Sequence, residues 1–241
     1  MNLYTSLSKD KKQFVVLIDP DKYNTRQLID LAGLARKSMV SYLFVGGSLL
    51  SDDNLDSTLK VIKDHCDIPV IIFPGDIMQI NSRADGILLL SLISGRNADL
   101  LIGKHVIAAP YLKKSGLEIL PTGYMLIDSG RPTTASYMSN SLPIPSDKDE
   151  IAVSTAIAGT MLGLKLIYMD GGSGAQNAIP LSMIEKVKKN IEVPLIVGGG
   201  IRTPEDAADR FRAGADIIVV GNAIETKNSL LERIAEVVFS F

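Results

Sequence analysis

The chain contains very little cysteine, histidine or tryptophan, and each shortage excludes a class of site. The single cysteine, Cys66, cannot form an internal disulfide, and one unpaired thiol suits a reducing compartment. The two histidines, His65 and His105, fall in separate helical patterns away from the strand ends, so a zinc site or a Ser-His-Asp triad has little support. Tryptophan is absent and aromatic residues are scarce, which removes the stacking platforms of single-strand nucleic-acid binders.

The chain also lacks an excess of charge of either sign. Its formal net charge is −2, so it does not carry the basic surface expected of a protein that binds nucleic acid. The first residues have no apolar core typical of a signal peptide, and no apolar stretch is long enough to span a bilayer without a charge or a glycine break. These absences predict a soluble cytoplasmic protein.

What the sequence does contain is a series of eight short apolar runs that alternate with helical patterns. One helical pattern begins at Thr25, and another begins with the cap-and-proline pair Thr203 and Pro204. Strands that alternate with helices indicate a parallel α/β sheet, and eight of them favour a (β/α)₈ TIM barrel, here a single domain over residues 1–241. The runs end at Pro20, Ser48, Gly75, Leu90, Asp128, Gly172, Gly200 and Asn222.

Three segments depart from the regular alternation. Between Gly75 and Asp85 there is room for only a short helix or a loop, so the third crossover helix is expected to be degenerate. Residues 129–146 are polar and contain three prolines, and a loop of this length is often functional. The helix after Asp147 is apolar or small on nearly every side, which indicates either close packing against the barrel or burial in a subunit contact.

Glycine-rich turns follow the last three runs. Glycine at a strand end lets backbone N–H groups approach a ligand, and the loops after strands 7 and 8 of a TIM barrel often bind phosphate. Gly199, Gly200, Gly221 and Asn222 therefore predict a site for a phosphorylated small molecule. Tight turns without a ligand remain the alternative interpretation.

Carboxylates stand at two of the strand ends. Asp19 closes the first run and Ser48 the second, and oxygen ligands at neighbouring strand ends suit Mg²⁺, although an Asp before a helix is more often a cap. Asp170 precedes the first glycine turn, where it can accept a proton from a substrate hydroxyl or hold the loop by a hydrogen bond. Tyr168, two residues earlier, points inward like Asp170 and is typical of a core residue.

Several motifs occur together in the order of one family. The chain resembles the geranylgeranylglyceryl phosphate synthases, prenyltransferases that make the first ether bond of archaeal-type lipids. The resemblance implies a modified TIM barrel that joins sn-glycerol 1-phosphate to a prenyl diphosphate, here geranylgeranyl diphosphate, with Mg²⁺. It also implies a homo-oligomer, a dimer or a hexamer, and allows a transient membrane contact for product release. The motifs are LIDPDK, VGGS, RNADLLIGKHVIAAP, LPIPSDKDEIA, YMDGGSGA, VGGGIRT and VVGN.

The same resemblance implies roles for individual residues. Asp19 and Ser48 match the metal ligands of the family. Asp170 and Tyr168 match its catalytic residues. The family usually has Glu at the position of Asp170, followed by Ala where this chain has Gly171. Leu17 stands where the short bacterial branch has Lys, so the chain looks closer to the archaeal-like branch. The implied substrate contacts are Tyr168, Met169, Asp170, Gly171, Gly172, Ser173, Gly174, Gly199, Gly200, Gly221 and Asn222.

Two other functions compete with this interpretation. A sugar-phosphate isomerase on the same scaffold uses paired aspartates on strands one and five, and Asp19 with Asp128 can mimic that pair. A non-catalytic prenyl-phosphate-binding protein is the other alternative, against which the retained carboxylate at Asp170 argues. The sequence does not set the prenyl chain length.

Overall fold

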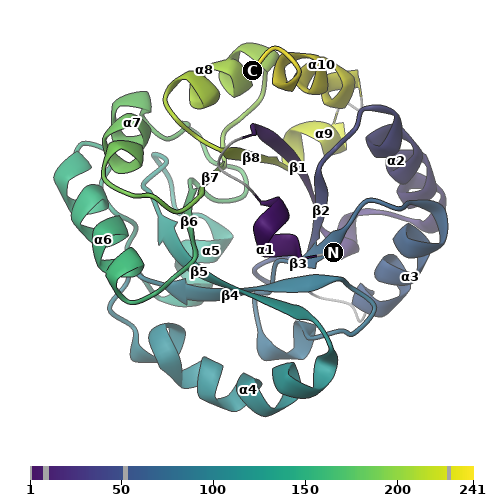
Figure 1. Ribbon diagram of the computed structural model, residues 1–241, viewed down its shortest axis with the longest axis horizontal. Coiled ribbons are helices and arrows are strands. Elements are labelled where there is room, and N and C mark those ends of the chain that lie inside the picture. Colours follow the sequence, from purple (N-terminus) through teal and green to yellow (C-terminus); the bar gives the residue numbers. More distant parts are fainter. Residues whose placement is uncertain (1, 8–10, 51–53, 227–228) are drawn as a thin grey trace.

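Eight parallel strands close into a barrel in the computed structural model, which describes residues 2–7, 11–50, 54–226 and 229–241. Each strand pairs with the next along the chain, and β1 also pairs with β8. Figure 1 looks down the barrel and shows the helices around it. The predicted TIM barrel is therefore confirmed. The strands are β1 Gln13–Ile18, β2 Tyr42–Val45, β3 Val70–Ile72, β4 Gly86–Leu92, β5 Glu118–Leu126, β6 Leu166–Asp170, β7 Leu195–Gly198 and β8 Ile217–Val220.

The strands are short, and most are buried on both faces because helices cover the outside while side chains fill the inside. In β6, Tyr168 points into the barrel with Phe73 and Tyr124, whereas Ile167 and Met169 join the outer core under the helices. This alternation places every second strand residue on the axis, and at the carboxyl end of β6 it aims Asp170 toward the opening.

The helices follow the apolar patterns of the sequence. Helix α2 corrects one detail of the prediction: its cap is Asn24, not Thr25, because Asn24 has extended backbone angles and exchanges hydrogen bonds with Gln27 while Thr25 is already helical. The helices are α1 Leu3–Ser6, η1 Pro20–Lys22, α2 Thr25–Lys37, α3 Leu55–His65, η2 Ile77–Gln79, η3 Asp99–Gly103, α4 Lys104–Ser115, α5 Thr134–Ser139, α6 Asp149–Met161, α7 Leu181–Lys189, α8 Pro204–Arg212, α9 Asn222–Thr226 and α10 Ser229–Val238.

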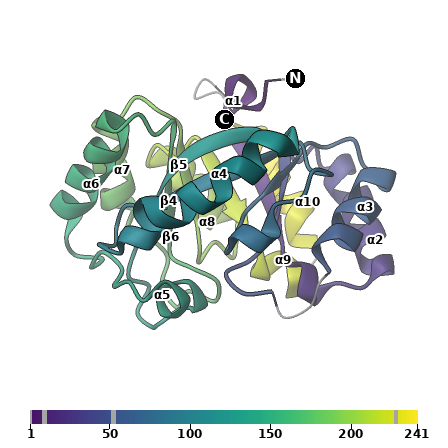
Figure 2. The same ribbon diagram turned by 90° about the horizontal axis from the view of Figure 1, so that it is seen from below.

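Two crossovers are irregular. The third contains only the single turn η2, as the short spacing predicted. The polar segment 129–146 contains the short helix α5, which Figure 2 shows at the end of the barrel opposite α1 rather than along its side. Helix α6 packs Ala152, Ala156 and Gly159 inward and leaves Met161 exposed. Packing against the barrel is therefore confirmed for one face of α6, and a subunit contact on the other stays a prediction.

The amino-terminal end of the barrel is closed by α1, which lies at the centre of the ring in Figure 1. Leu3 and Leu7 are buried in the inner core, and the N–H groups of Leu3 and Tyr4 donate to the Glu118 carboxylate at 2.6 and 2.8 Å. The open end is therefore the carboxyl end of the strands. Within the described ranges, no helix has both the length and the apolar composition needed to cross a membrane.

Candidate active site

A cavity of about 640 Å³ opens at the carboxyl ends of the strands. The loops after β1, β2, β6, β7 and β8 form most of its wall, and α5 contributes Thr134 and Ala135. This is the end at which TIM barrels bind their ligands. Most residues singled out from the sequence lie in this one wall, namely Asp19, Ser48, Tyr168, Asp170, Gly172, Ser173, Gly174, Gly199, Gly200, Gly221 and Asn222.

Two predicted contact residues lie outside the wall. The side chain of Met169 is fully buried in the outer core, because alternation along β6 turns it toward the helices. Gly171 is buried behind the loop, and its N–H donates to the carbonyl of Gly198 at 3.0 Å. The structure therefore gives both residues a packing position beneath the cavity.

Asp170 ends β6 and is nearly buried, with 8% of its surface exposed. Its Oδ1 accepts a hydrogen bond from the N–H of Gly172 at 2.7 Å, and its Oδ2 accepts one from the hydroxyl of Tyr124 at 2.5 Å. The first bond holds the glycine loop, which is one of the two roles inferred from the sequence. The carboxylate nevertheless lines the cavity, so its position also permits proton transfer.

Burial governs the electrostatics of this group. It raises the pKa of Asp170, while the hydrogen bonds from Tyr124 and Gly172 act in the opposite direction. Burial and the Asp170 charge place the pKa values of Tyr124 and Tyr168 well above that of an exposed tyrosine. Both phenols therefore keep their protons, and the Asp170 carboxylate is a stronger base than an exposed aspartate.

The glycines after β7 are required by the fold itself. Gly199 and Gly200 have φ angles of +82° and +73°, which favour glycine. A methyl group on Gly199 would lie 2.7 Å from the nitrogen of Gly171, and one on Gly200 would lie 2.8 Å from Cα of Ala178. The loops after β6 and β7 thus pack back to back, and this contact alone accounts for both glycines.

Gly221, after β8, differs from these two. The nearest atom to an added methyl group is the carbonyl oxygen of Leu17 at 3.4 Å, which is ordinary van der Waals contact. The protein itself therefore has room for a larger residue at this point of the cavity wall. Close approach of a ligand is the remaining physical reason for glycine here.

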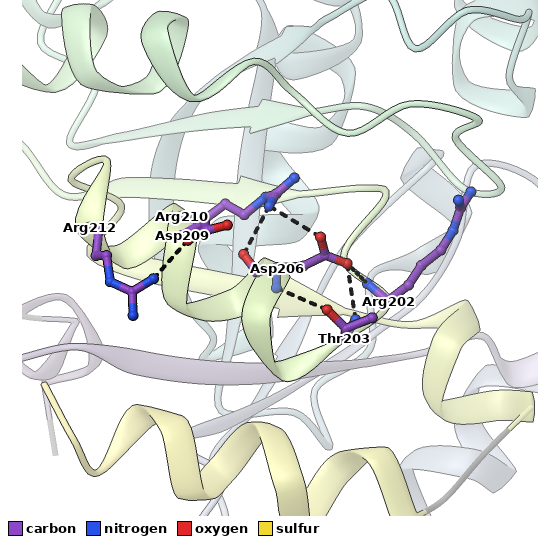
Figure 3. Close-up of polar contacts among 6 residues, drawn as sticks. All are labelled: Arg202, Thr203, Asp206, Asp209, Arg210 and Arg212. Carbon is purple, nitrogen blue, oxygen red and sulfur yellow. Dashed lines mark hydrogen bonds and ion pairs between the residues drawn. The ribbon is translucent and has the colours of Figure 1, made fainter.

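The loop after β7 is anchored where α8 begins (Figure 3). Thr203 caps the helix as predicted, accepting a hydrogen bond from the N–H of Asp206 at 3.0 Å. Oδ2 of Asp206 in turn accepts hydrogen bonds from the N–H groups of Arg202 and Thr203 at 2.9 and 3.0 Å. Arg210, only 6% exposed, donates to the carbonyl and the carboxylate of Asp206. This network fixes the last residues of the glycine turn.

Asp19 and Ser48 line the cavity from the loops after the neighbouring strands β1 and β2. Asp19 caps η1 by accepting the N–H of Asp21 at 3.2 Å, and its Oδ2 lies 3.6 Å from Nζ of Lys22. A methyl group on Gly47 would lie 3.9 Å from Oδ1 of Asp19, so the loops after β1 and β2 adjoin, as neighbouring strand ends predict. Asp19 is thus both the cap and a carboxylate on the cavity wall.

This donor set suits one kind of metal site. The described part of the chain holds no cluster of three or more His, Cys, Asp or Glu side chains that could bind an ion. A single carboxylate beside a hydroxyl, open to the cavity, fits Mg²⁺, which keeps several waters and takes further oxygens from substrate phosphates. Asp19 and Ser48 are therefore compatible with Mg²⁺ bound together with a phosphorylated substrate.

Several residues in the cavity wall or in contact with it were missed by the sequence analysis. Tyr124 pairs with Tyr168 across β5 and β6 and contacts Asp170 from inside the barrel. Three cations line the wall, namely Lys22, Arg202 and Arg233. Arg202 stands two residues after the glycine turn and Lys22 belongs to the LIDPDK motif, so both could have been found from the sequence. Arg233, in α10, carries no such signal.

The histidines and Asp128 lie away from the cavity wall. Nδ1 of His65 lies 2.8 Å from the carbonyl of Val61, and Nε2 of His105 lies 3.3 Å from Oγ of Ser91 behind β4. Oδ1 of Asp128 accepts the N–H of Gly130 at 2.9 Å. The aspartate pair that an isomerase would use, Asp19 with Asp128, is therefore not brought together in the cavity.

Comparison with known proteins places this geometry in one family. A family model described as the PcrB family matches residues 7–238. The geranylgeranylglyceryl phosphate synthases of Chitinophaga pinensis and Spirosoma linguale are 54% and 52% identical to the chain over 231 residues, which cover 96% of this chain and 92% and 93% of theirs. The crystal structure of (S)-3-O-geranylgeranylglyceryl phosphate synthase from Thermoplasma acidophilum, in complex with sn-glycerol-1-phosphate, superposes with a TM-score of 0.94 at 31% identity and covers both chains completely.

Proposed function

Because the chain belongs to the PcrB family, we propose that it is a prenyltransferase that joins sn-glycerol 1-phosphate to geranylgeranyl diphosphate through an ether bond and releases pyrophosphate. One observation carries the proposal: a single cavity has glycine loops and a buried carboxylate, Asp170, on one side and Asp19 with Ser48 on the other. The relatives named above and the glycerol-phosphate complex of the Thermoplasma enzyme support it. We further propose that residues 1–241 form one catalytic domain.

In this mechanism the loops after β6, β7 and β8 bind the phosphate of the glycerol substrate through backbone N–H groups. That contact orients a free hydroxyl toward Asp170 and toward C1 of the prenyl diphosphate. The hydroxyl oxygen forms a bond to C1 as the bond between C1 and the diphosphate oxygen breaks. The proton passes to Asp170, whose burial makes it a stronger base, and pyrophosphate leaves with the electron pair.

We propose that Asp19 and Ser48 hold the Mg²⁺ of this site. The ion would supply positive charge to the leaving pyrophosphate. Lys22 lies 3.6 Å from Asp19 and lines the same wall, so this side of the cavity already carries a cation next to the carboxylate. Diphosphate binding is therefore assigned to the loops after β1 and β2, and glycerol phosphate to the loops after β6, β7 and β8.

The alternatives fit the cavity less well. Asp128 is absent from the wall and its carboxylate accepts a backbone hydrogen bond, so an acid and base pair with Asp19 is missing for isomerisation. A protein that only binds a prenyl phosphate needs no buried carboxylate beside the phosphate loops, and burial of such a charge costs free energy.

The proposal is tested by incubating the protein with labelled geranylgeranyl diphosphate, sn-glycerol 1-phosphate and Mg²⁺. We expect an acid-stable product that extracts into organic solvent, formed in step with pyrophosphate. Asp170→Asn should lower kcat by about 100-fold or more, the usual contribution of a general base, and Asp19→Ala should weaken Mg²⁺-dependent turnover. Asp128→Asn is the matched control and should retain activity. Label that stays water-soluble with every component present would rule out the transferase.

A further inference from the structure

The loop after β6 is held by two arginines that come from neighbouring loops. Nε and Nη2 of Arg131, in the segment after β5, both donate to the carbonyl of Gly174. Nη2 of Arg202, in the loop after β7, donates to the carbonyl of Ala175 at 2.5 Å. Two successive carbonyl groups are thus bound by guanidinium groups from opposite sides. We call Arg131 and Arg202 the arginine clamp.

The backbone of this loop is shaped to allow the contact. Gly174 has a φ of +72°, which favours glycine, and an added methyl group would lie 2.9 Å from Nη2 of Arg131. A side chain at residue 174 would therefore displace the guanidinium from the carbonyl. Glycine at this position serves the contact with Arg131 as well as the turn.

The clamp has a consequence on the inner side of the loop. Peptide groups are planar, so the guanidinium that holds the carbonyl of Gly174 also fixes the N–H of Ala175 in the same peptide group. That N–H donates to the carbonyl of Gly172 at 3.2 Å and closes a turn with Ser173 and Gly174 at its centre. In the described part of the chain, no protein group accepts a hydrogen bond from the N–H groups of Ser173 and Gly174, although both residues line the cavity. Buried or lining amides without a partner are suited to an anionic ligand.

We propose that Arg131 is a positioning residue for the glycerol phosphate. It holds the loop after β6 so that the amides of Ser173 and Gly174 face the phosphate, and Arg202 supports it from the other side. The inference rests on the proposed function, because it deepens the assignment of the loop as the phosphate site. Arg131 does not line the cavity, so its effect reaches the ligand through the loop, whereas Arg202 lines the wall itself.

The nature of the contact predicts which replacements preserve it. Arg131 presents two N–H groups in a fixed planar fork to one oxygen, a geometry that a lysine ammonium reproduces only in part. Glutamine is neutral and shorter, and alanine removes the contact altogether. KM for sn-glycerol 1-phosphate should therefore be lowest with Arg at residue 131, higher with Lys, and highest with Gln or Ala.

The test measures steady-state kinetics of Arg131→Ala, Arg131→Gln and Arg131→Lys with both substrates varied. For Arg131→Ala we expect KM for sn-glycerol 1-phosphate to rise about tenfold, which corresponds to about 1.4 kcal/mol. We expect kcat and KM for the prenyl diphosphate to change by less than about twofold, because the loops after β1 and β2 are untouched. Arg131→Lys should recover part of the loss, and ethylguanidinium in the buffer should lower the raised KM of Arg131→Ala alone.

Arg212→Ala is the matched control, because Arg212 is an exposed arginine in α8 whose partner is Asp209, away from the cavity. Titration calorimetry with sn-glycerol 1-phosphate alone separates the two proposals. Wild-type protein that binds none overturns the proposed function and the clamp together. If wild-type protein binds sn-glycerol 1-phosphate no more tightly than Arg131→Ala does, the role of the clamp is overturned and the proposed function stands. The same conclusion follows if the Arg131 variants lower only kcat and the melting temperature.

Discussion

At the scale of single residues, the proposed chemistry can be tested at the hydrogen-bonded pair of Asp170 and Tyr124. The folded state binds a proton at Asp170 more tightly than the unfolded chain does, because burial raises its pKa. The stability from this group is therefore present at low pH, below the pKa of the unfolded chain, and is lost as the pH rises through the folded pKa. Above the folded pKa the ionised carboxylate costs stability relative to an exposed aspartate.

Tyr124→Phe tests this pair through the pH dependence of activity. The change removes the hydroxyl that donates to Oδ2 of Asp170, so the carboxylate loses a stabilising bond and the pKa of Asp170 rises further. A base must be deprotonated to act, so the acidic limb of kcat/KM for sn-glycerol 1-phosphate should move to higher pH. On that limb the rate should fall about tenfold, since a hydrogen bond to a charged group is worth roughly 1.5–3 kcal/mol.

Tyr42→Phe is the control for this measurement. Tyr42 is also a buried tyrosine, but its hydroxyl lies 2.5 Å from Oγ of Ser6 at the closed end of the barrel. Loss of the Tyr42 hydroxyl should lower the stability of the fold and leave the pH profile of kcat/KM unchanged. A Tyr124→Phe profile that overlays the wild-type profile would show that Asp170 is not the group titrating in the rate.

The sequence predicts the residue positions that depend on one strand alone, and it misses contacts that depend on how two strands or loops lie together. Alternation along β6 was sufficient to predict that Tyr168 and Asp170 share the inner face. Tyr124 was missed because its contact with Asp170 depends on the register between β5 and β6, and no single strand encodes a register. Arg131 was missed for the same reason, since its partner lies in another loop.

At the scale of elements, the glycine turns combine two requirements that the sequence cannot separate. Gly199 and Gly200 need their glycines for a left-handed backbone and for contact with the loop after β6. Any larger residue there would destabilise the fold whether or not a ligand binds. Gly221 has no such constraint, so it is the position at which binding can be tested apart from packing.

Gly221→Ala should fold normally and bind its substrate poorly. The added methyl group meets only ordinary contacts with Leu17, so the melting temperature should change by no more than a few degrees. The same methyl group should keep the phosphate from the backbone and raise KM for sn-glycerol 1-phosphate about tenfold, the equivalent of roughly 1.4 kcal/mol. Gly33→Ala, in α2 with no atom within 4 Å of the new methyl group, is the control. An unchanged KM in Gly221→Ala would place the phosphate elsewhere.

Elements were predictable where local chemistry decides them. The eight strands and the degenerate third crossover follow from apolar runs and their spacing, and the cap at Thr203 follows from its proline and acidic neighbours. The cap of α2 was placed one residue too late because Asn24 and Thr25 are both good caps, and only backbone angles distinguish them. The short helix α5 was not predicted, since six residues give too little periodicity to recognise.

At the scale of the whole molecule, the helical layer covers the barrel unevenly. The third crossover carries only η2, whereas the fifth carries α5, which lies over the open end, and then α6 along the side of the barrel. A groove of about 570 Å³ lies along α6 and is lined also by the segment after β4 and by Leu101 of η3. Large apolar side chains are exposed in the groove and in α4, which follows η3, including Leu162 at 79% and Val106 at 66%. Exposed apolar surface of this kind is typical of a protein–protein interface.

The expected homo-oligomer should therefore form through this side of the barrel. Charged side chains at Val106 and Leu162 would have to be buried in such a contact, which is costly without partners, so Val106→Asp with Leu162→Asp should reduce the mass in light scattering to one chain of 26.0 kDa. Met39→Asp, at a residue that is 66% exposed elsewhere, is the control and should leave the mass unchanged. A wild-type protein that is already monomeric, or a double variant of unaltered mass, would contradict the assignment.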